Sequence, residues 1–240
     1  MTAAAFRALH RVRGADGPLV LPGPWDAASA RAFADAGFPA LATPSAGVSA
    51  SLGYADGAAP PAEMFAAVAR IARAVDVPVS ADIEDGYGLP ARELVARLLE
   101  TGAVGCNLED SDRAGHGLKD PREQADRLAE IRAEAGDALV VNARVDTFLW
   151  GDRDLTSALA RARLYAEAGA DCLFPIVAPP EFLAPIAAET GLPVNALAQP
   201  GGLTPRELGA RGASRVTFGG GLHRSAMAVV ERIAAGLRVT

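Results

Sequence analysis

Acidic residues gather at the ends of three short apolar runs of this sequence, and one arginine lies among them. They are Asp82 and Glu84, then Glu109 and Asp110, then Arg144 and Asp146. If the runs are strands of one sheet, so many carboxylates beside one arginine would repel one another unless a cation lay among them. A hard divalent cation fits, since Mg²⁺ typically takes one or two carboxylates with waters and substrate. From spacing alone, the alternative stays open that these acids cap helices or pair with surface arginines.

Apolar or β-branched runs alternate with amphipathic helical stretches along the whole sequence, which is typical of repeated strand–helix units. The predicted strands are residues 19–22, 39–44, 77–83, 103–109, 138–145, 171–177, 192–198 and 214–219. Gly37 and Gly102 are placed to end the helices that precede two of them. The sequence therefore predicts an α/β fold, a single TIM-type (β/α)8 barrel domain over residues 1–240 with a short N-terminal helix.

A barrel explains how residues far apart in the sequence can share one site, because all strands end at the face where active sites lie. Two connections after strand ends are long, residues 44–61 and 110–121, and both carry glycine, serine and charge. Long connections on this face commonly cover an active site, although ordinary loop insertion is the alternative. We expect the part from Ser111 to Lys119 to act as a lid over bound ligand.

Charge and composition limit the partners of the protein. The formal net charge is −6 and no basic tract occurs, which argues against nucleic acid or an anionic membrane as a partner. No run of about 18 apolar residues appears and the N-terminus lacks the apolar core of a secretory signal, so the expected location is the cytoplasm. An anionic substrate would then need a metal ion or a positioned arginine.

Cysteine and lysine usage argues against other chemistries. Cys106 and Cys172 lie inside apolar runs, so buried reduced thiols are expected rather than a disulfide. Two cysteines cannot build a cysteine-based zinc site. Lys119 is the single lysine and lies in a predicted loop, whereas a Schiff-base enzyme on a barrel needs a lysine at a strand end. Imine chemistry is therefore not expected.

Five segments resemble the isocitrate lyase / phosphoenolpyruvate mutase superfamily, in that family's order and spacing. They are WDAASARAFADAGFPALATPSAGVSASLGYADG, VPVSADIEDGYG, AVGCNLEDS, NARVDTF and AGADCLF. The resemblance implies an enzyme that uses Mg²⁺ to stabilise the enolate of a small 2-oxo acid. It also implies that Asp82, Glu84 and Glu109 hold the metal ion, directly or through water.

The resemblance further implies how the substrate is held. The turn of Ser45, Ala46 and Gly47 would offer hydroxyl and backbone N–H donors to the substrate carboxylate. Arg144 would clamp carboxylate and enolate oxygens and act in catalysis. A guanidinium suits this role because it makes two parallel hydrogen bonds, which a lysine cannot.

Other positions match the family less specifically. Asp56 would lie near the reacting centre, and Asn195 on the seventh predicted strand would contact substrate. Trp25 matches an aromatic residue near the substrate, but packing in the core is an equally good explanation. The glycines at 219–221 could bind phosphate or merely allow a tight turn. His223 and Arg224 are expected to be structural or surface groups.

The sequence departs from the family pattern at diagnostic positions. The tricarboxylate lyases carry a cysteine in the loop after the fourth strand, which protonates the leaving carbanion; here that loop reads Arg113, Ala114, Gly115, His116. A methyl group cannot donate a proton. His116 is a candidate loop-borne acid, with a solvated histidine without catalytic duty as the alternative. Ile176 stands where those lyases have a glutamate and the mutases a histidine, and the mutase loop is not evident.

These departures favour a lyase that forms or cleaves a C–C bond at C3 of a small 2-oxo or 2-hydroxy dicarboxylate, with decarboxylation of an oxaloacetate-like acid as the leading example. A pyruvate-type enolate on Mg²⁺ can take its proton from water, so loss of the thiol matters less. The alternatives are a phosphoenolpyruvate or carboxyphosphonate mutase, a phosphonopyruvate hydrolase, and a non-catalytic ligand-binding relative. The expected partners are a small anionic 2-oxo acid and further copies in a homo-oligomer, although the C-terminal segment that relatives exchange looks missing or shortened.

Overall fold

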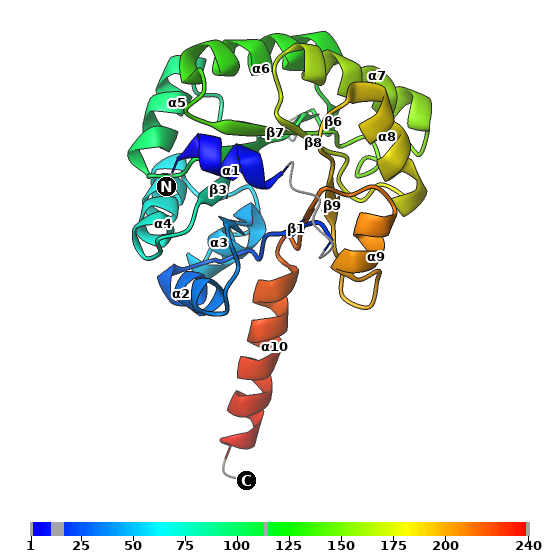
Figure 1. Ribbon diagram of the computed structural model, residues 1–240. Coiled ribbons are helices and arrows are strands. Elements are labelled where there is room, and N and C mark those ends of the chain that lie inside the picture. Colours follow the sequence, from blue (N-terminus) through cyan, green and yellow to red (C-terminus); the bar gives the residue numbers. More distant parts are fainter. Residues whose placement is uncertain (1, 11–16, 113–114, 239–240) are drawn as a thin grey trace.

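The computed structural model describes residues 2–10, 17–112 and 115–238, and its centre is a parallel barrel (Figure 1). The barrel strands are β1 (Leu19–Val20), β2 (Leu41–Ala42), β3 (Val79–Asp82), β4 (Gly105–Leu108), β7 (Val140–Arg144), β8 (Cys172–Phe174), β9 (Asn195–Leu197) and β10 (Arg215–Thr217). Each of these strands lies inside one of the runs predicted from the sequence, although the observed strands are shorter.

Hydrogen bonding closes the barrel. A five-stranded parallel sheet has the order β2-β3-β4-β7-β8, and a three-stranded parallel sheet has the order β1-β10-β9. A parallel bridge between Leu173 and Val194 joins β8 to the start of β9. On the other side, the backbone N–H of Ala42 donates to the carbonyl of Pro22 at 3.1 Å. The predicted TIM-type α/β barrel is therefore confirmed.

Helices surround the barrel and supply the apolar layer that covers the strands. They are α2 (Ala27–Asp35), α4 (Pro61–Arg73), α5 (Ala91–Glu100), α6 (Pro121–Ala135), α7 (Leu155–Glu167), α8 (Leu183–Thr190), α9 (Pro205–Ala210) and the short 3-10 helix η1 (Pro180–Phe182). Gly37 and Gly102 follow α2 and α5 with φ of 90° and 82°, conformations that favour glycine, as expected of helix stops. The largest core cluster lies between α5–α8 and the strands they cover.

The predicted N-terminal helix is α1 (Ala3–Leu9), and it lies at the end of the barrel where the strands begin. Phe6 is fully buried in a cluster with Leu21 and Ala42 of the β1–β2 region. Arg7 Nε donates to Asp171 Oδ1 at 2.7 Å, which fixes the helix to the start of β8. This helix therefore forms a floor beneath the barrel.

The two long connections, which the sequence predicts to be loops, contain short helices and strands. Residues 44–61 include α3 (Ser45–Ser51). Residues 110–121 include β5 (Ser111–Asp112) and β6 (Gly117–Leu118), which pair antiparallel as a small hairpin. Residues 113–114 of this connection, which include Ala114, lie outside the described residues.

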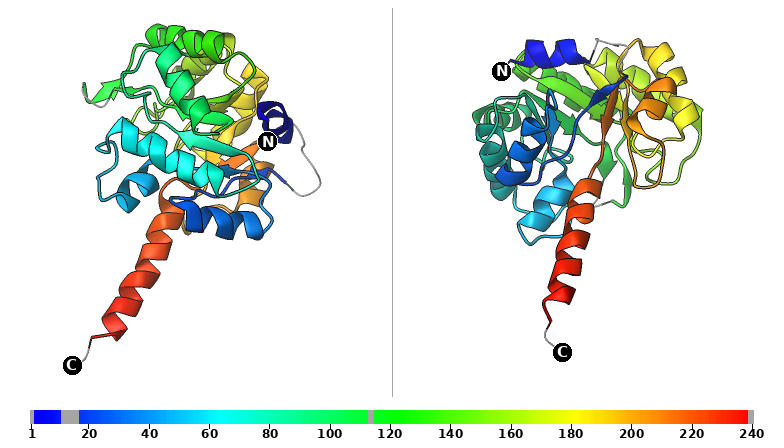
Figure 2. Two further views of the ribbon diagram at one scale, coloured as in Figure 1. Left: turned by 90° about the vertical axis from the view of Figure 1, so that its left-hand side faces the viewer. Right: turned by 60° about the horizontal axis from the view of Figure 1, so that its bottom comes forward.

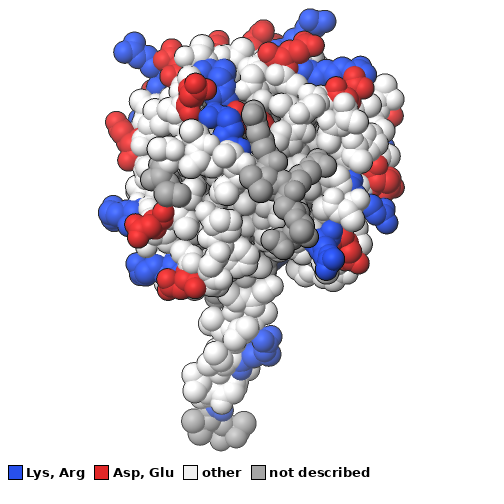
Figure 3. Space-filling model, in the orientation of Figure 1, with Lys and Arg blue, Asp and Glu red and all other residues white. Residues whose placement is uncertain are grey.

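The last helix, α10 (Gly221–Gly236), projects away from the barrel in every view (Figures 1 and 2). Met227, Val229, Val230, Ile233 and Leu237 of this segment are exposed. Figure 3 shows few charged side chains on the visible face of the helix. In the described part of the chain, no helix has the length and apolar character needed to span a membrane.

Candidate active site

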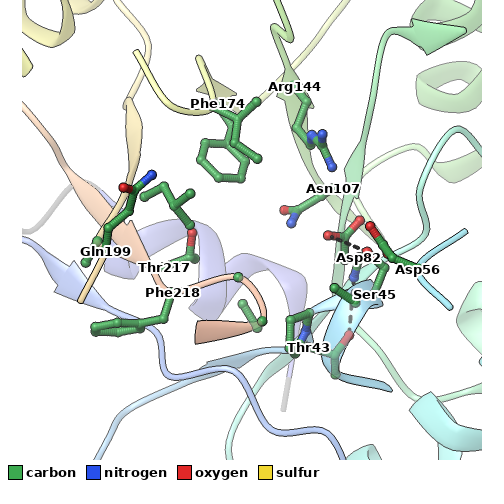
Figure 4. Close-up of a pocket in the computed structure, with 18 of the residues that line it drawn as sticks. Thr43, Ser45, Asp56, Asp82, Asn107, Arg144, Phe174, Gln199, Thr217 and Phe218 are labelled. Atoms are coloured by element: carbon green, nitrogen blue, oxygen red, sulfur yellow. Dashed lines mark hydrogen bonds between the residues drawn. The ribbon is translucent and has the colours of Figure 1, made fainter. Parts of the chain in front are cut away.

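A cavity of about 440 Å³ opens where the barrel strands end, and it has two unlike sides (Figure 4). One side, which we call the polar wall, consists of Thr43, Ser45, Asp56, Asp82, Asn107 and Arg144. The facing side, which we call the apolar wall, consists mainly of Phe174, Ile176, Leu197, Ala198 and Phe218, with the uncharged polar residues Gln199 and Thr217 beside them. The polar wall follows β2, β3, β4 and β7, and the apolar wall follows β8, β9 and β10. The cavity therefore lies at the C-terminal face of the barrel, where the sequence predicted the site.

Arg144, the last residue of β7, is held by two carboxylates. Its Nε and Nη2 donate to the two oxygens of Asp146 at 3.0 and 2.8 Å, and its Nη1 lies 2.6 Å from Glu109 Oε2. Burial by itself would lower the pKa of Arg144, but Asp146 and Glu109 raise it above its ordinary value. A fixed and permanently charged guanidinium therefore faces the cavity.

Asp110 and Asp146 belong to the support of Arg144 rather than to the cavity lining. Asp110 Oδ1 accepts a hydrogen bond from the backbone N–H of Asp146 at 2.8 Å. Its Oδ2 accepts from Arg161 Nη1 at 3.0 Å and from the Tyr165 hydroxyl at 2.6 Å. These buried bonds fix the backbone just after Arg144, so the position of the guanidinium is determined by two layers of contacts.

Asp82, the last residue of β3, projects into the cavity from the polar wall. Its Oδ2 accepts a hydrogen bond from Ser45 Oγ at 3.3 Å, and its Oδ1 accepts one from the backbone N–H of Glu84 at 3.2 Å. The backbone N–H of Asp82 donates to Thr43 Oγ1 at 3.2 Å. The strand ends of β2 and β3 are thus joined through polar side chains at the edge of the cavity.

The electrostatic environment of Asp82 suits a bound cation. Burial raises the pKa of Asp82 above its ordinary value; Arg144 opposes this shift, and Glu109 and Asp56 add to it. A divalent cation in the cavity would favour the ionised carboxylate. Among the described residues, no three His, Cys, Asp or Glu side chains are arranged to hold a metal ion. Mg²⁺ needs only one or two carboxylates beside waters and substrate, so Asp82 with Glu109 nearby still fits it.

Glu84 does not face the cavity beside Asp82, although the alternation of side chains along a strand predicted that it would. Because β3 ends at Asp82, the alternation does not extend to Glu84, whose φ is 54°. Glu84 is buried and does not line the cavity, and Glu109 is fully buried beside Arg144. A role of these two residues in metal binding stays a prediction.

The turn predicted to hold the substrate carboxylate forms the start of α3. Ser45 and Ala46 line the cavity. Gly47 lies behind them, where an added Cβ would be 3.0 Å from Pro44 Cγ and 3.3 Å from His223 Cβ. A larger residue would push this turn away from the first turn of α10, so glycine is required for the close approach.

Trp25, Asn195 and His116 do not line the cavity among the described residues. Trp25 packs edge-to-face on His223 with ring centres 5.2 Å apart, which agrees with the packing explanation. Asn195 is buried behind Thr217, which lines the cavity, with Asn195 Nδ2 3.2 Å from Thr217 Oγ1. His116 is exposed in the β5–β6 hairpin. The roles of these three residues in the reaction stay predictions.

Asn107 and Arg224 line the cavity and were not predicted as site residues. For Asn107 a signal existed, because it lies two residues before Glu109 and so shares its face of the predicted strand. Arg224 was assigned to the surface. It reaches the cavity because α10 begins at Gly221, four residues after the end of β10, so the first helical turn lies at the rim of the barrel.

Comparisons with known proteins agree with this geometry. The family model of phosphoenolpyruvate phosphomutase matches residues 6–238. An uncharacterised protein of Mycobacterium tuberculosis is 38% identical over 204 residues, which cover 84% of this chain and 78% of that protein. The 2-methylisocitrate lyase of Bacillus subtilis is 32% identical over 167 residues, which cover 65% of this chain and 54% of that enzyme. This chain therefore aligns with about half the length of that lyase.

Solved structures extend the comparison. A candidate phosphonomutase from Burkholderia cenocepacia is 39% identical with a TM-score of 0.90, covering 98% of this chain and 99% of that one. An oxaloacetate acetylhydrolase solved with its product oxalate is 25% identical with a TM-score of 0.83, covering 97% and 86%. A phosphonopyruvate hydrolase solved with oxalate and Mg²⁺, at 24% identity and a TM-score of 0.87, shares the fold and covers 99% and 87%. On the strength of the matching family model, this chain belongs to the phosphoenolpyruvate phosphomutase family of the isocitrate lyase / phosphoenolpyruvate mutase superfamily, a group of lyases and mutases.

Proposed function

We propose that the protein decarboxylates an oxaloacetate-like 2-oxo dicarboxylate with the help of Mg²⁺. The observation that carries this proposal is the contrast between the two walls: a fixed guanidinium and a carboxylate face the apolar wall, which includes Ile176. The family resemblance implies that Ile176 stands where the tricarboxylate lyases have a glutamate. Asp82, with Glu109 and Glu84 as the other predicted ligands, would hold the ion. When bound, Mg²⁺ supplies a Lewis acid for the 2-oxo group.

The polar wall offers binding groups for the 2-oxo acid end of the substrate. Ser45 Oγ and the backbone of its turn would donate to the C1 carboxylate. Arg144, already oriented by Asp146 and Glu109, would donate to the oxygen that becomes negatively charged. Arg144 is fixed before the reaction, so it needs no reorganisation as charge develops. The Ser45 hydroxyl, which donates to Asp82 in the structure, would first turn to the carboxylate.

The other end of the substrate would meet the apolar wall. A carboxylate pressed against Phe174 and Ile176 loses hydration, whereas the CO₂ that it becomes does not need it. The C3–C4 bond breaks, its electron pair passes to the enolate, and CO₂ leaves; water then protonates C3 to give the 2-oxo monoacid. Arg224 at the rim would bind the C4 carboxylate and hold it in register before cleavage.

A P–C bond reaction is the second candidate, favoured by the similarity to the candidate phosphonomutase over nearly the whole length of both chains. The enolate chemistry on the polar wall would be the same. The difference would lie in the group that leaves C3, which would be a phosphoryl group instead of CO₂.

The test is a product screen by NMR with equal enzyme and Mg²⁺ on oxaloacetate, phosphonopyruvate and 2-methylisocitrate. We expect enzyme-dependent pyruvate from oxaloacetate above the rate with Mg²⁺ alone, and much slower turnover of the others. Turnover of phosphonopyruvate alone would show that the enzyme acts on a P–C bond and not on a C–C bond. Efficient cleavage of 2-methylisocitrate would show that another group replaces the missing thiol. Calorimetric binding without any product would indicate a non-catalytic relative.

A further inference from the structure

Asn107 is a cavity residue for which the chemistry above has no use. It lies in β4, beside Asp82 in the register of β3 and beside Asn142 in the register of β7. Figure 4 shows its carboxamide between Asp82 and Arg144 on the polar wall. The side chain is 5% exposed, so its few accessible atoms belong to the cavity.

Hydrogen bonds from below determine which end of this carboxamide faces the cavity. Asn142 Nδ2 donates to Asn107 Oδ1 at 2.8 Å, and Arg215 Nη2 donates to the same oxygen at 3.3 Å. Asn142 alone could turn over and accept instead, because its own Oδ1 has no hydrogen-bond partner among the described residues. A guanidinium can only donate. Arg215 therefore requires Oδ1 of Asn107 to point toward the barrel floor. Nδ2 of Asn107 is then turned the opposite way, toward the cavity.

Arg215 is itself held without a carboxylate. It is fully buried in β10, its Nη1 lies 3.4 Å from His10 Nε2, and its guanidinium carbon lies 5.9 Å from the centre of the Phe6 ring. Within the described residues it forms no ion pair. Its charge is thus not neutralised by a neighbour in the barrel floor.

His10 is suited to accept from Arg215. Its Nδ1 lies 2.9 Å from the carbonyl oxygen of Phe6, which can only accept, so Nδ1 carries the proton and Nε2 is free to accept. Burial and then Arg215 lower the pKa of His10 to about 4, so the ring is neutral near pH 7. The chain of contacts from α1 through Arg215 to Asn107 therefore has one consistent arrangement of donors and acceptors.

We propose that Asn107 Nδ2 donates a hydrogen bond to the developing enolate oxygen of the bound 2-oxo acid, and that buried Arg215 is the positioning residue that keeps this donor turned toward the cavity. The inference rests on the proposed function for the identity of the ligand. Asn107 would complete the donor set of Arg144 and the Ser45 turn. A donor fixed before the reaction is the arrangement that stabilises a developing oxyanion.

Asn107→Asp is the sharpest variant, because it keeps an acceptor for Asn142 and Arg215 and replaces the cavity-facing donor with an acceptor. We expect kcat on oxaloacetate to fall by about 10²- to 10³-fold, as for the loss of one oxyanion donor. Ser80→Ala is the matched control, because Ser80 is as deeply buried in the neighbouring strand and its Oγ has no hydrogen-bond partner among the described residues. A kcat of Asn107→Asp within twofold of the control would overturn the proposal.

Arg215→Met and Arg215→Lys test the positioning role. With methionine, both orientations of the Asn107 carboxamide become accessible, so kcat should fall while thermal unfolding remains cooperative. With lysine, which also only donates, part of kcat should return. If the methionine variant does not fold, Arg215→Gln decides instead, because glutamine can accept as well as donate and so no longer fixes the Asn107 carboxamide. An unchanged kcat and KM in that variant would reduce Arg215 to a structural residue.

A spectroscopic readout separates this inference from the proposed function. The side-chain ¹H–¹⁵N resonances of Asn107 are assigned by their absence in Asn107→Asp, and wild-type protein is then titrated with Mg²⁺ and oxalate. One amide proton should move downfield in wild type and less so in Arg215→Met. If that shift occurs although oxaloacetate is not turned over, the inference stands and the proposed function fails. If oxaloacetate is decarboxylated but saturating oxalate leaves the resonance in place, the inference fails.

Discussion

The polar and apolar walls of the cavity are built on opposite principles. On the polar wall, Arg144 contacts Asp146 and Glu109, and Asp82 accepts from Ser45 and from the backbone N–H of Glu84. On the apolar wall, residues such as Phe174 contribute shape and exclude water. The polar wall therefore fixes one arrangement of charge, whereas the apolar wall limits only the shape and polarity of the ligand groups that can pack against it.

The difference indicates where substitutions should matter. A change on the polar wall leaves buried charges without their partners, so its effect on the reaction should be large. A change at Arg224, an exposed residue at the rim of the cavity, alters one exposed contact. Modification of Cys106 and Cys172, which are buried and do not line the cavity, should alter nothing in the reaction.

Asp82→Asn should have the largest effect. The substitution removes an anionic oxygen from the one predicted metal ligand that lines the cavity, so Mg²⁺-dependent turnover of oxaloacetate should fall more than about 10²-fold. Steady-state rates measured against Mg²⁺ concentration test this, with circular dichroism as the check on folding. Asp126→Asn, on the exposed face of α6, is the charge-matched control. Full activity of wild type in excess chelator would contradict the metal hypothesis.

Arg144→Lys should lower kcat about 10²-fold or more, while retaining the charge. An ammonium cannot donate to Asp146 and Glu109 and still present a donor to the cavity, so both the support and the oxyanion contact are lost. Single-turnover rates with oxaloacetate measure the effect on the chemical step. Arg163→Lys, in an exposed pair with Glu189, should have wild-type rates. A rate near wild type in Arg144→Lys would show that charge alone suffices on the polar wall.

Arg224→Gln should have a smaller effect, confined to the C4 end of the substrate. An exposed charge pair contributes up to about 1 kcal/mol, so KM for oxaloacetate should rise about fivefold. Inhibition by oxalate, which lacks the distal carboxylate, should not change. Arg232→Gln removes the same charge farther along α10 and serves as the control. An equal rise in the inhibition constant of oxalate would place Arg224 at the other end of the substrate.

The sequence predicted the barrel because its signals are local. Each strand lies within a short apolar run, and glycines such as Gly37 end the helices. It also predicted much of the polar wall, because residues at the ends of parallel strands converge. The position of Glu84 was missed because the exact end of a strand is not visible in its pattern. The contact of Arg224 with the cavity depends on how closely α10 follows β10, which periodicity does not encode. The orientation of Asn107 depends on Arg215, 108 residues away.

Alkylation of the two cysteines should have no effect on the reaction. Cys106 lies in β4 and Cys172 in β8, both are free and buried, and burial raises the pKa of each thiol to about 12. Near pH 8 the reactive thiolate is therefore about one part in 10⁴, and reagent cannot reach it without local unfolding. Treatment of native protein with iodoacetamide should leave the oxaloacetate rate within about twofold of the untreated rate. Mass spectrometry should show no adducts, whereas denatured protein should carry two, one for each cysteine.

The same experiment bears on how the enolate acquires its proton. Relatives that use a loop cysteine as acid must lose activity when that thiol is blocked, but this chain has Ala114 at the corresponding position. If activity is lost in step with a single adduct, one of the buried thiols must become accessible during turnover and take part in it. If activity is retained, neither thiol can supply the proton, and the proton at C3 must come from water or from an oxygen or nitrogen acid. The loss of a general acid typically costs about 10²- to 10⁴-fold, so 2-methylisocitrate cleavage should then be slower than oxaloacetate decarboxylation by a factor in that range.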